Sequence, residues 1–298
     1  MPDLEVVLRD GEASTSLGIW SFPRLPTPGF RLGVKAADGT VLYLRVRALE
    51  QRPDQSGAMI CERDATDTAS SSAAGLAQMV PVNRAGTTRA EDIFTSIYKK
   101  NLWGNAESVS GPGSTLEYTE NLRRALPAIF DKYAIRSIFD APSGDFNWMS
   151  AVIADHPLDY LGGDIVQQLV DRCNELHASD SVRFVHFDIT RDAFPAADLW
   201  LCRDCLFHLS FADIRKALEQ FVASGISYLL TTTHPNGGTF NRDIATGSFR
   251  MIDLFLPPFG FPQDTLERID DFGPPWPRRL VCLWSREQVE HALRTGGL

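Results

Sequence analysis

The sequence predicts an α/β fold in which helices cover both faces of a mainly parallel sheet, and three observations support this. Short apolar runs alternate with helical patterns between residues 137 and 233. The first three runs end in Asp140, Asp164 and Asp188, which are equally spaced (164 − 140 = 24 and 188 − 164 = 24). A strand, a helix and two short loops of a βαβ unit take about this length.

The expected elements follow one another through this part of the chain. Strands are predicted at 137–140, 159–163, 182–187, 198–203 and 227–233, and helices at 146–155, 165–178 and 211–223. After an insertion at 235–263, two late strands are expected at 266–270 and 279–284. Upstream, apolar residues recur at helical spacing over 90–101 and about 118–133, with a Gly/Ser loop at 104–115 between them.

The N-terminal part has a different pattern. Alternating apolar residues over 1–50, with a hairpin turn expected at 37–39, predict a small β-rich appendage. Residues 51–85 are rich in Ser, Ala, Asp and Gln and are interpreted as a linker. The remaining segment, 86–298, is predicted to be the functional domain.

Composition narrows the classes of function. The net charge is −9 and no run of Lys or Arg is longer than two, which argues against a nucleic-acid partner. No stretch has the roughly 20 apolar residues of a membrane span, and no export signal is visible. Five cysteines, an odd number, suggest reduced thiols and a cytoplasmic location. Cys202 and Cys205 lack a second pair, so buried thiols are favoured and no metal is expected.

The three acids point to a ligand site. Parallel strands share a direction, so their carboxyl ends meet at one edge of the sheet, where open α/β sheets bind ligands. One Asp after a strand is commonly a helix cap. Three in register, with a small-residue turn after Asp140, favour a ligand that carries hydroxyl or amino groups.

The stretch from Ile138 to Met149, IFDAPSGDFNWM, carries a more specific signal. It resembles the first motif of class I S-adenosylmethionine-dependent methyltransferases, although Gly144 is the only one of the usual alternating glycines that is kept. It is similar to a bacterial group that reads D-x-P-C/S-G-D-F-x-W-M. The likeness covers roughly residues 90–290 and also includes Trp103-Gly104, 110–114, Arg203-Asp204 with His208, and Asn241-x-Asp243-x-x-x-Gly247-x-x-Arg250.

This resemblance implies a Rossmann-like methyltransferase sheet and S-adenosylmethionine as cofactor. The residues implied for donor binding are Asp140, Ala141, Pro142, Gly144, Asp145, Trp148, Asp164, Ile165, Asp188, Ile189 and Arg203. Asp164 is expected to accept hydrogen bonds from the ribose hydroxyls. A nicotinamide dehydrogenase is disfavoured, because Pro142 and Asn147 replace two of the three glycines of its G-x-G-x-x-G fingerprint.

Chemistry is expected at the ends of the fourth and fifth strands. An oxygen acceptor is a poor nucleophile until it loses its proton, and His titrates near neutral pH. His208 is the first candidate for the base, and His234 and Asp204 are the alternatives. Asp204 could instead hold Arg203 or orient a histidine. Alignment of the reactants alone could also supply much of the rate.

Two segments are candidates for covering the site. The insertion mixes aromatic residues, prolines and charges, which suits a lid over the acceptor but also a packed surface loop. The 104–115 segment could cover the donor or simply join two helices. The residues expected to contact substrate are Trp103, Ser110, Gly111, Ser114, Asn241 and Arg250.

The sequence therefore predicts a cytoplasmic methyltransferase acting on a small-molecule or glycan-linked acceptor, with oxygen as the favoured atom. Neither nucleic acid nor membrane is expected as a partner, and a homodimer is left open. The alternative is a protein that keeps the fold without chemistry, as a ligand sensor or scaffold.

Overall fold

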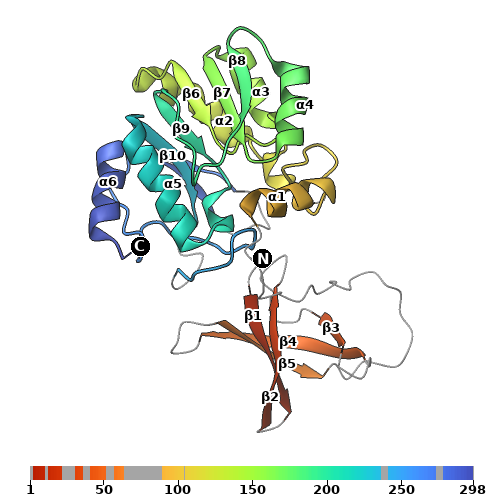
Figure 1. Cartoon of the computed structure of the whole chain (residues 1–298). Coiled ribbons are helices and arrows are strands. Elements are labelled where there is room, and N and C mark those ends of the chain that lie inside the picture. The colour runs from red at the N-terminus through yellow and green to blue at the C-terminus, as the bar shows by residue number, and fades with distance from the viewer. Residues whose placement is uncertain are drawn as a thin grey trace. The chain divides into compact units, whose positions relative to one another are not determined.

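The computed structural model describes residues 3–10, 13–21, 31–35, 41–51, 57–63, 89–103, 105–235, 241–272 and 278–297. The chain divides into two compact units. Unit 1 comprises Met1–Gly86 with Ser248–Arg250, and unit 2 comprises Thr87–Gly247 with Met251–Leu298. Each unit has its own sheet (Figure 1).

Unit 1 contains a five-stranded sheet in the order β2-β1-β5-β4-β3. Its strands are β1 (Asp3–Asp10), β2 (Ala13–Ser21), β3 (Arg31–Lys35), β4 (Val41–Gln51) and β5 (Gly57–Arg63). Neighbouring strands are antiparallel except for β1 and β5, which run parallel. The β-rich character agrees with the sequence pattern, and Leu44 and Cys61 are fully buried.

One boundary in this unit was wrong. β5 lies inside the segment interpreted as a linker, and β4 continues to Gln51. The short apolar run from Ala58 to Cys61 pairs with β1 on one side and β4 on the other, so partners distant in sequence outweigh its polar flanks. The predicted turn at 37–39 and residues 52–56 and 64–85 of the predicted linker lie outside the described residues.

Unit 2 is built around a seven-stranded sheet in the order β11-β12-β10-β9-β6-β7-β8. The strands are β6 (Ser137–Asp140), β7 (Asp159–Asp164), β8 (Val182–His186), β9 (Leu199–Cys202), β10 (Tyr228–Thr233), β11 (Glu267–Asp270) and β12 (Leu280–Ser285). β6 to β10 are parallel, and β12 runs antiparallel to both of its neighbours, β10 and β11. This topology confirms the predicted Rossmann-like α/β sheet.

Helices flank the sheet on both faces (Figure 1). They are α1 (Ala90–Lys99), α2 (Glu120–Lys132), α3 (Asn147–Asp155), α4 (Gln167–His177), α5 (Phe211–Ser224) and α6 (Arg286–Thr295). The sequence prediction missed α6, although Ser285 and Gln288 form the capping box that starts it. Two short 3₁₀ turns, η1 (Pro112–Ser114) and η2 (Leu206–His208), lie in the loops.

The strand order fixes where a ligand site belongs. The chain moves from β6 outward to β7 and β8, and then returns to place β9 on the other side of β6. Ligands of such sheets bind at the carboxyl ends of the two strands where this reversal occurs. β9 is fully buried, and the Trp200 Nε1 atom donates to the Ala141 carbonyl 2.9 Å away, which ties β9 to the turn after β6.

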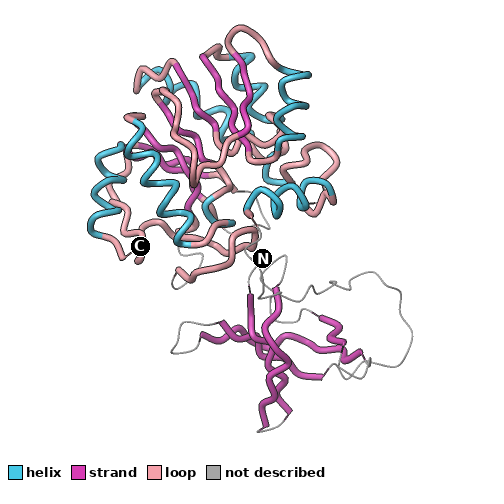
Figure 2. The backbone as a smooth tube through the Cα atoms, viewed as in Figure 1, coloured by secondary structure: helices cyan, strands magenta, loops and turns pink. Residues whose placement is uncertain are grey.

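Residues 241–266, which include 241–263 of the insertion predicted at 235–263, contain neither helix nor strand (Figure 2). Within the described ranges, no helix has the length and apolar character that crossing a membrane requires.

Candidate functional site

Three acids mark the carboxyl edge of the sheet, as the spacing predicted. Asp140 is the last residue of β6 and Asp164 the last of β7, while Asp188 follows β8 by two residues. Asp140 pairs in register with Gly162 on one side and Leu201 on the other. The three strands are neighbours, so the acids lie along one edge and begin at the strand reversal.

The turn after β6 brings the backbone close to the next strand. The Ser143 amide donates to the Gly163 carbonyl at 2.9 Å, and the Gly144 amide donates to Asp164 Oδ2 at 3.1 Å. Gly144 has φ +57°, and a Cβ there would lie 2.2 Å from Ser110 Oγ. Glycine is therefore required both by the backbone conformation and by the close approach of Ser110.

The two central acids are buried carboxylates with unusual protonation. Burial raises the pKa of Asp140 to about 7, although a 2.6 Å hydrogen bond from the Tyr160 hydroxyl acts in the opposite direction. Burial likewise raises the pKa of Asp164 to about 6, against hydrogen bonds from the Val166 and Gly144 amides. The two amides use one oxygen each, so each oxygen retains acceptor capacity.

Asp145 was predicted to contact the donor, which stays a prediction, and its carboxylate holds the upstream loop. Oδ1 accepts from Ser108 Oγ at 2.9 Å and from Ser110 Oγ at 3.3 Å, and Oδ2 accepts from the Val109 amide at 2.9 Å. The Asp145 amide in turn donates to Ser110 Oγ at 3.2 Å. The loop between α1 and α2 is therefore hydrogen-bonded to the first motif through Asp145.

Three buried charges, Arg203, Asp271 and Arg279, and the partly buried Asp204 form a cluster beyond the ends of β9 and β11, here called the four-charge cluster. Arg203 binds Asp271 through two N–H groups at 2.9 and 3.1 Å. Arg279 Nη1 lies 2.8 Å from Asp204 Oδ2, and Arg203 Nη1 lies 3.3 Å from the same oxygen. The two cations balance the two anions.

Arg203 was predicted to bind the donor, and this stays a prediction, although most of its N–H groups already make internal contacts. A guanidinium has five N–H groups, and four of those of Arg203 face Asp204, Asp271 and the Gly113 carbonyl. Its cation also lies 5.4 Å from the centre of the Trp148 ring. Arg203 is thus committed to internal contacts between the β9 end, the upstream loop and α3.

Asp204 is an ion-pair partner and a poor candidate for the base. Burial opposes its charge, but the guanidinium groups of Arg203 and Arg279 outweigh it and hold its pKa below the ordinary value. Thr232 Oγ1 accepts from the Asp204 amide at 2.9 Å and donates to its Oδ1 at 3.1 Å. Of the two other roles that the sequence left open for Asp204, its contacts agree with that of holding Arg203.

The sequence did not single out Asp271, Arg279 or Tyr160. Asp271 directly follows β11 and Arg279 directly precedes β12, so charged residues beside two late strands were the available signal. Arg279 also lies over the ring of Tyr118, 4.8 Å from its centre. Tyr160 lies within β7, where nothing in the apolar pattern indicates a hydroxyl directed at Asp140.

His208 lies in η2, beyond the end of β9, and is half-buried. The Trp103 ring stacks on it with centroids 5.6 Å apart and an angle of 28° between the planes. The Trp103 side chain also packs against Gly111, where an added Cβ would approach its Cβ to 3.2 Å. Trp103 therefore joins the upstream loop to the candidate base, while catalysis by His208 stays a prediction.

His234 lies close by because β9 and β10 are parallel neighbours, but its environment is unsuited to a base. Burial and the charge of Arg279 lower the pKa of His234 to about 4. The Ile252 amide lies 3.4 Å from Nδ1 and donates to it, which places the ring proton on Nε2. The neutral ring then has no acceptor nitrogen left for a substrate proton.

The insertion is packed onto the site through its own hydrogen bonds. The Gly247 amide donates to the His208 carbonyl at 2.8 Å, and Asp243 Oδ1 accepts from the Phe211 amide at 2.6 Å. Asn241 was predicted to bind substrate, and this stays a prediction; its side-chain amide group bonds to the backbone of Asp253, Leu256 and Pro257. Arg250 is buried, and its role in substrate binding stays a prediction.

The remaining residues predicted to bind a ligand lie in the loops after β6, β7 and β8 and at the η1 turn. Asp188 Oδ1 accepts from the amide and hydroxyl of Thr190, as in a helix-cap-like turn. Ile165 and Ile189 each follow an acid, and Ala141 and Pro142 form the turn after β6. Gly111, with φ +97°, directly precedes the η1 turn, and the buried Ser114 is its last residue. Their contacts with a ligand stay predictions.

The five cysteines are all buried and free of disulfides. Among the described residues, no three His, Cys, Asp or Glu side chains are grouped so as to hold a metal ion.

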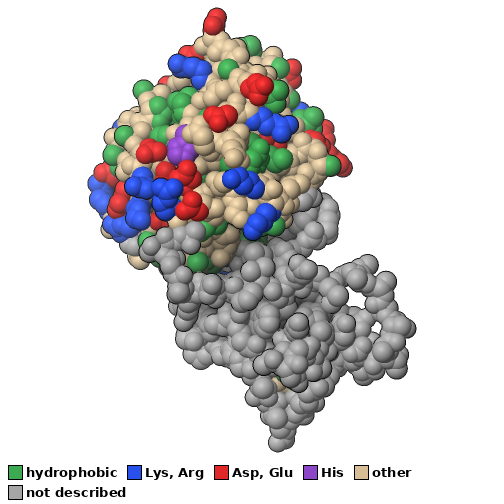
Figure 3. All heavy atoms as spheres, turned by 45° about the vertical axis from the view of Figure 1, so that its right-hand side comes forward, with side chains coloured by type: hydrophobic (Ala, Val, Ile, Leu, Met, Phe, Trp, Pro, Cys, Tyr) green, Lys and Arg blue, Asp and Glu red, His purple; other side chains and the backbone are tan. Residues whose placement is uncertain are grey.

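On the face seen in Figure 3, acidic and basic side chains of unit 2 are interspersed.

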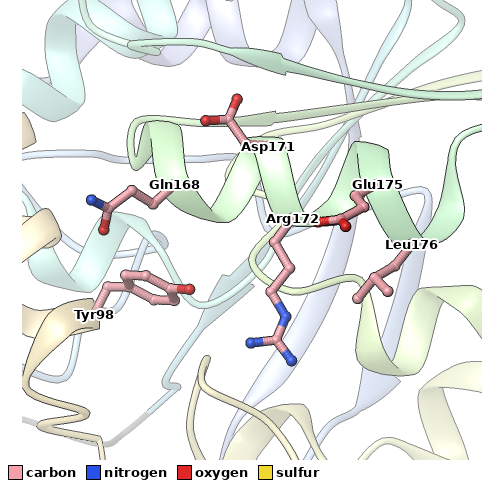
Figure 4. Close-up of a pocket in the computed structure, with 6 residues that line it drawn as sticks. All are labelled: Tyr98, Gln168, Asp171, Arg172, Glu175 and Leu176. Carbon is pink, nitrogen blue, oxygen red and sulfur yellow. The ribbon is translucent and has the colours of Figure 1, made fainter.

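An open depression of about 520 Å³ lies on the outer side of α4, with Tyr98 of α1 at its border (Figure 4). The other residues that line it are Gln168, Asp171, Arg172, Glu175 and Leu176. None of the predicted site residues is among these six, so the depression is separate from the predicted site.

Neither protein-family models nor curated protein sequences give a match to the chain. Among solved structures, it is similar to human N-acetylserotonin methyltransferase in complex with SAM, with 14% identity over 65% of this chain and 59% of that one and a TM-score of 0.42. It is also similar to magnesium protoporphyrin IX methyltransferase from Synechocystis PCC 6803 with bound SAH, with 11% identity, 66% and 97% coverage and a TM-score of 0.46. Identities this low leave function to be argued from the chain's own residues.

Proposed function

We propose that the chain is an S-adenosylmethionine-dependent methyltransferase that acts on an oxygen of a small-molecule or glycan-linked acceptor. One observation carries the proposal: two buried carboxylates, Asp140 and Asp164, end adjacent parallel strands beside the Gly144 turn, at the reversal of strand order. Gly144 lacks a Cβ at a point where Ser110 Oγ approaches its backbone too closely for a side chain to fit.

The residues at this edge suit the donor chemically. Asp164 has acceptor capacity left for ribose hydroxyls, and a charge-assisted hydrogen bond of this kind is worth about 1.5–3 kcal/mol. When bound, the donor supplies a methyl group on a positively charged sulfur. The buried thiols fit an enzyme of a reducing compartment such as the cytoplasm.

His208 is proposed as the group that takes the acceptor proton. It follows the β9 end by a few residues, and Trp103 limits the positions of its ring. His234 and Asp204 are set aside for the reasons given by their contacts. The proton would move to a ring nitrogen of His208 as the acceptor oxygen attacks the methyl carbon.

The test is a product assay on the full chain. The protein is incubated with methyl-labelled S-adenosylmethionine and a panel of hydroxylated small molecules and sugars, and S-adenosylhomocysteine is measured by mass spectrometry. We expect its formation to depend on at least one acceptor and the label to appear on that acceptor. Binding of the donor without turnover on any acceptor would favour the sensor or scaffold alternative, and failure to bind it would contradict the proposal.

A further inference from the structure

Asp204 is the outward end of the four-charge cluster. Its side chain is 21% exposed, against 4% for Arg203, 1% for Asp271 and 10% for Arg279. The two arginines and Asp271 thus lie behind it, and their charges sum to one positive charge. The cluster as a whole is neutral and presents its negative end outward.

The backbone at Asp204 is held in an unfavourable conformation. Its φ is +54°, a left-handed value that costs a non-glycine residue about 1 kcal/mol or more. The paired contacts with Thr232 of β10 and the ion pair with Arg279 keep it there. Packing alone does not require a strained, partly exposed carboxylate, and its charge is placed to act on a charged ligand.

The position of Asp204 in the fold indicates which ligand charge its carboxylate would face. It lies two residues beyond the end of β9, the strand that adjoins β6 at the reversal of strand order. Transfer breaks the bond between methyl carbon and sulfur, and its electron pair stays on sulfur. The donor is thereby a sulfonium cation before transfer and a neutral thioether afterwards, so a fixed anion at this edge would distinguish the two.

We propose that the four-charge cluster makes the site prefer the charged methyl donor over the spent product, with Asp204 as the anion that acts on the sulfonium and Asp271 and Arg279 as positioning residues. The inference rests on the proposed function and deepens it. Ionised Asp204 favours the cation, while Asp271 neutralises Arg203 and prevents it from cancelling this effect.

The experiment measures two dissociation constants for each variant of the full chain, one for S-adenosylmethionine and one for S-adenosylhomocysteine, by calorimetric titration. Asp204→Asn leaves the cluster with one excess positive charge, and Arg279→Gln leaves it with one excess negative charge. A unit charge on the order of 8 Å away, at an effective dielectric constant of about 20–60, changes the ratio of the two constants by about 3–30-fold.

The two variants should shift this ratio in opposite directions. Asp204→Asn should weaken the donor relative to the product, and Arg279→Gln should strengthen it. A merely structural role would weaken both ligands together and leave the ratio unchanged. Asp271→Asn, which also adds one positive charge, should shift the ratio in the same direction as Asp204→Asn.

The matched control is Glu267→Gln. Glu267 is the first residue of β11, whereas Asp271 follows its last, and Glu267 pairs with Lys132 at 2.6 Å. This variant makes the same change in charge at the other end of the strand, and its ratio should stay within about twofold of wild type because the separation and the solvent screen it.

An unchanged ratio in Arg279→Gln, or shifts of the same sign in Arg279→Gln and Asp204→Asn, would overturn the inference. If Asp204→Asn does not fold, Arg279→Gln alone decides, since it must favour the donor. A wild-type chain that binds neither ligand would instead overturn the proposed function, and this inference with it.

Discussion

The carboxyl edge of unit 2 has two halves that hold their polar groups in different ways. At the ends of β6 and β7, carboxylates are bound by backbone amides and a tyrosine hydroxyl, and burial raises the pKa of both Asp140 and Asp164. At the ends of β9 and β11, carboxylates are bound by guanidinium groups. The first half keeps acceptor capacity for hydroxyl groups, whereas the second keeps fixed charges. We therefore expect the first half to hold the ribose of the donor and the second half to act where the methyl group is transferred.

The largest effect should come from the second half. If His208 takes the acceptor proton, His208→Gln should lower turnover by about 10²–10⁴-fold. The affinity for S-adenosylhomocysteine should stay near that of wild type, because His208 follows β9 and the donor acids end β6 and β7. Steady-state kinetics with an acceptor from the product assay, combined with calorimetry, checks both parts.

His234→Gln is the companion variant for that experiment. Because Nδ1 of His234 accepts from the Ile252 amide, we expect its pH–rate profile to keep the acidic limb that His208→Gln loses. If the limb disappears only in His234→Gln, the base is His234. If it persists in both variants, alignment of the reactants supplies the rate.

The next effect tests the first half through Gly144. Gly144→Ala should destabilise the fold by about 2–4 kcal/mol, since it adds a left-handed alanine and a collision with Ser110 Oγ. Gly260 has a similar φ of +61° but nothing within 4 Å of an added Cβ, so Gly260→Ala should cost only about 1 kcal/mol. Denaturant unfolding measures both, and equal losses would mean that the approach of Ser110 does not matter.

The two halves should also respond to pH with opposite signs. Asp140 and Asp164 have raised pKa values when folded, so their contribution to stability is present at low pH and is lost as pH rises to about 7 and about 6. His234 has a folded pKa lowered to about 4, so its contribution is present above its unfolded pKa and is lost as pH falls toward 4. In wild type the two slopes partly cancel between pH 4 and 7.

Variants separate these slopes. Asp140→Asn removes a contribution to stability that decreases as pH rises. The free energy of unfolding of this variant should therefore rise more with pH than that of wild type. His234→Gln removes a rising component and should show the reverse, with about 1.4 kcal/mol for each unit of pKa difference. Denaturant titrations from pH 4.5 to 7.5 measure the curves. If the free energy of unfolding changes with pH in the same way in all three proteins, burial does not shift the pKa values of Asp140 and His234.

The smallest effect is expected from a change outside both halves. A chain that starts at Val82 lacks the five strands of unit 1 but keeps the seven-stranded sheet and its core. It should fold and bind S-adenosylhomocysteine within about twofold of the full chain, as an independent domain would. A normal melting transition without binding would show that unit 1 completes the site or an obligatory dimer.

The first half could be predicted from the sequence because its interactions are local. The spacing of Asp140, Asp164 and Asp188 and the turn at Gly144 lie within about 50 consecutive residues, and regular βαβ geometry fixes their relative positions. The helices and strands of this stretch follow from apolar periodicity, which local chain geometry obeys.

The second half depends on partners far apart in sequence. Arg203 meets Asp271 across 68 residues and the Gly113 carbonyl across 90, so no spacing rule relates them. Asn241 likewise bonds to backbone carbonyls 12 to 16 residues further along the chain, which the spacing of the motif does not indicate. A polar residue at a strand end indicates a site, but only the folded chain reveals whether its hydrogen bonds are already made.

The claim that the β6–β7 edge binds the donor is tested most directly by calorimetric titration of S-adenosylhomocysteine into wild type, Asp164→Asn and Asp159→Asn. Asp159 is the exposed first residue of the same strand and lies at its opposite end. We predict one binding site per chain, a loss of about 1.5–3 kcal/mol in Asp164→Asn and no change in Asp159→Asn. Equal affinities in the two variants, or no binding by wild type, would contradict the account.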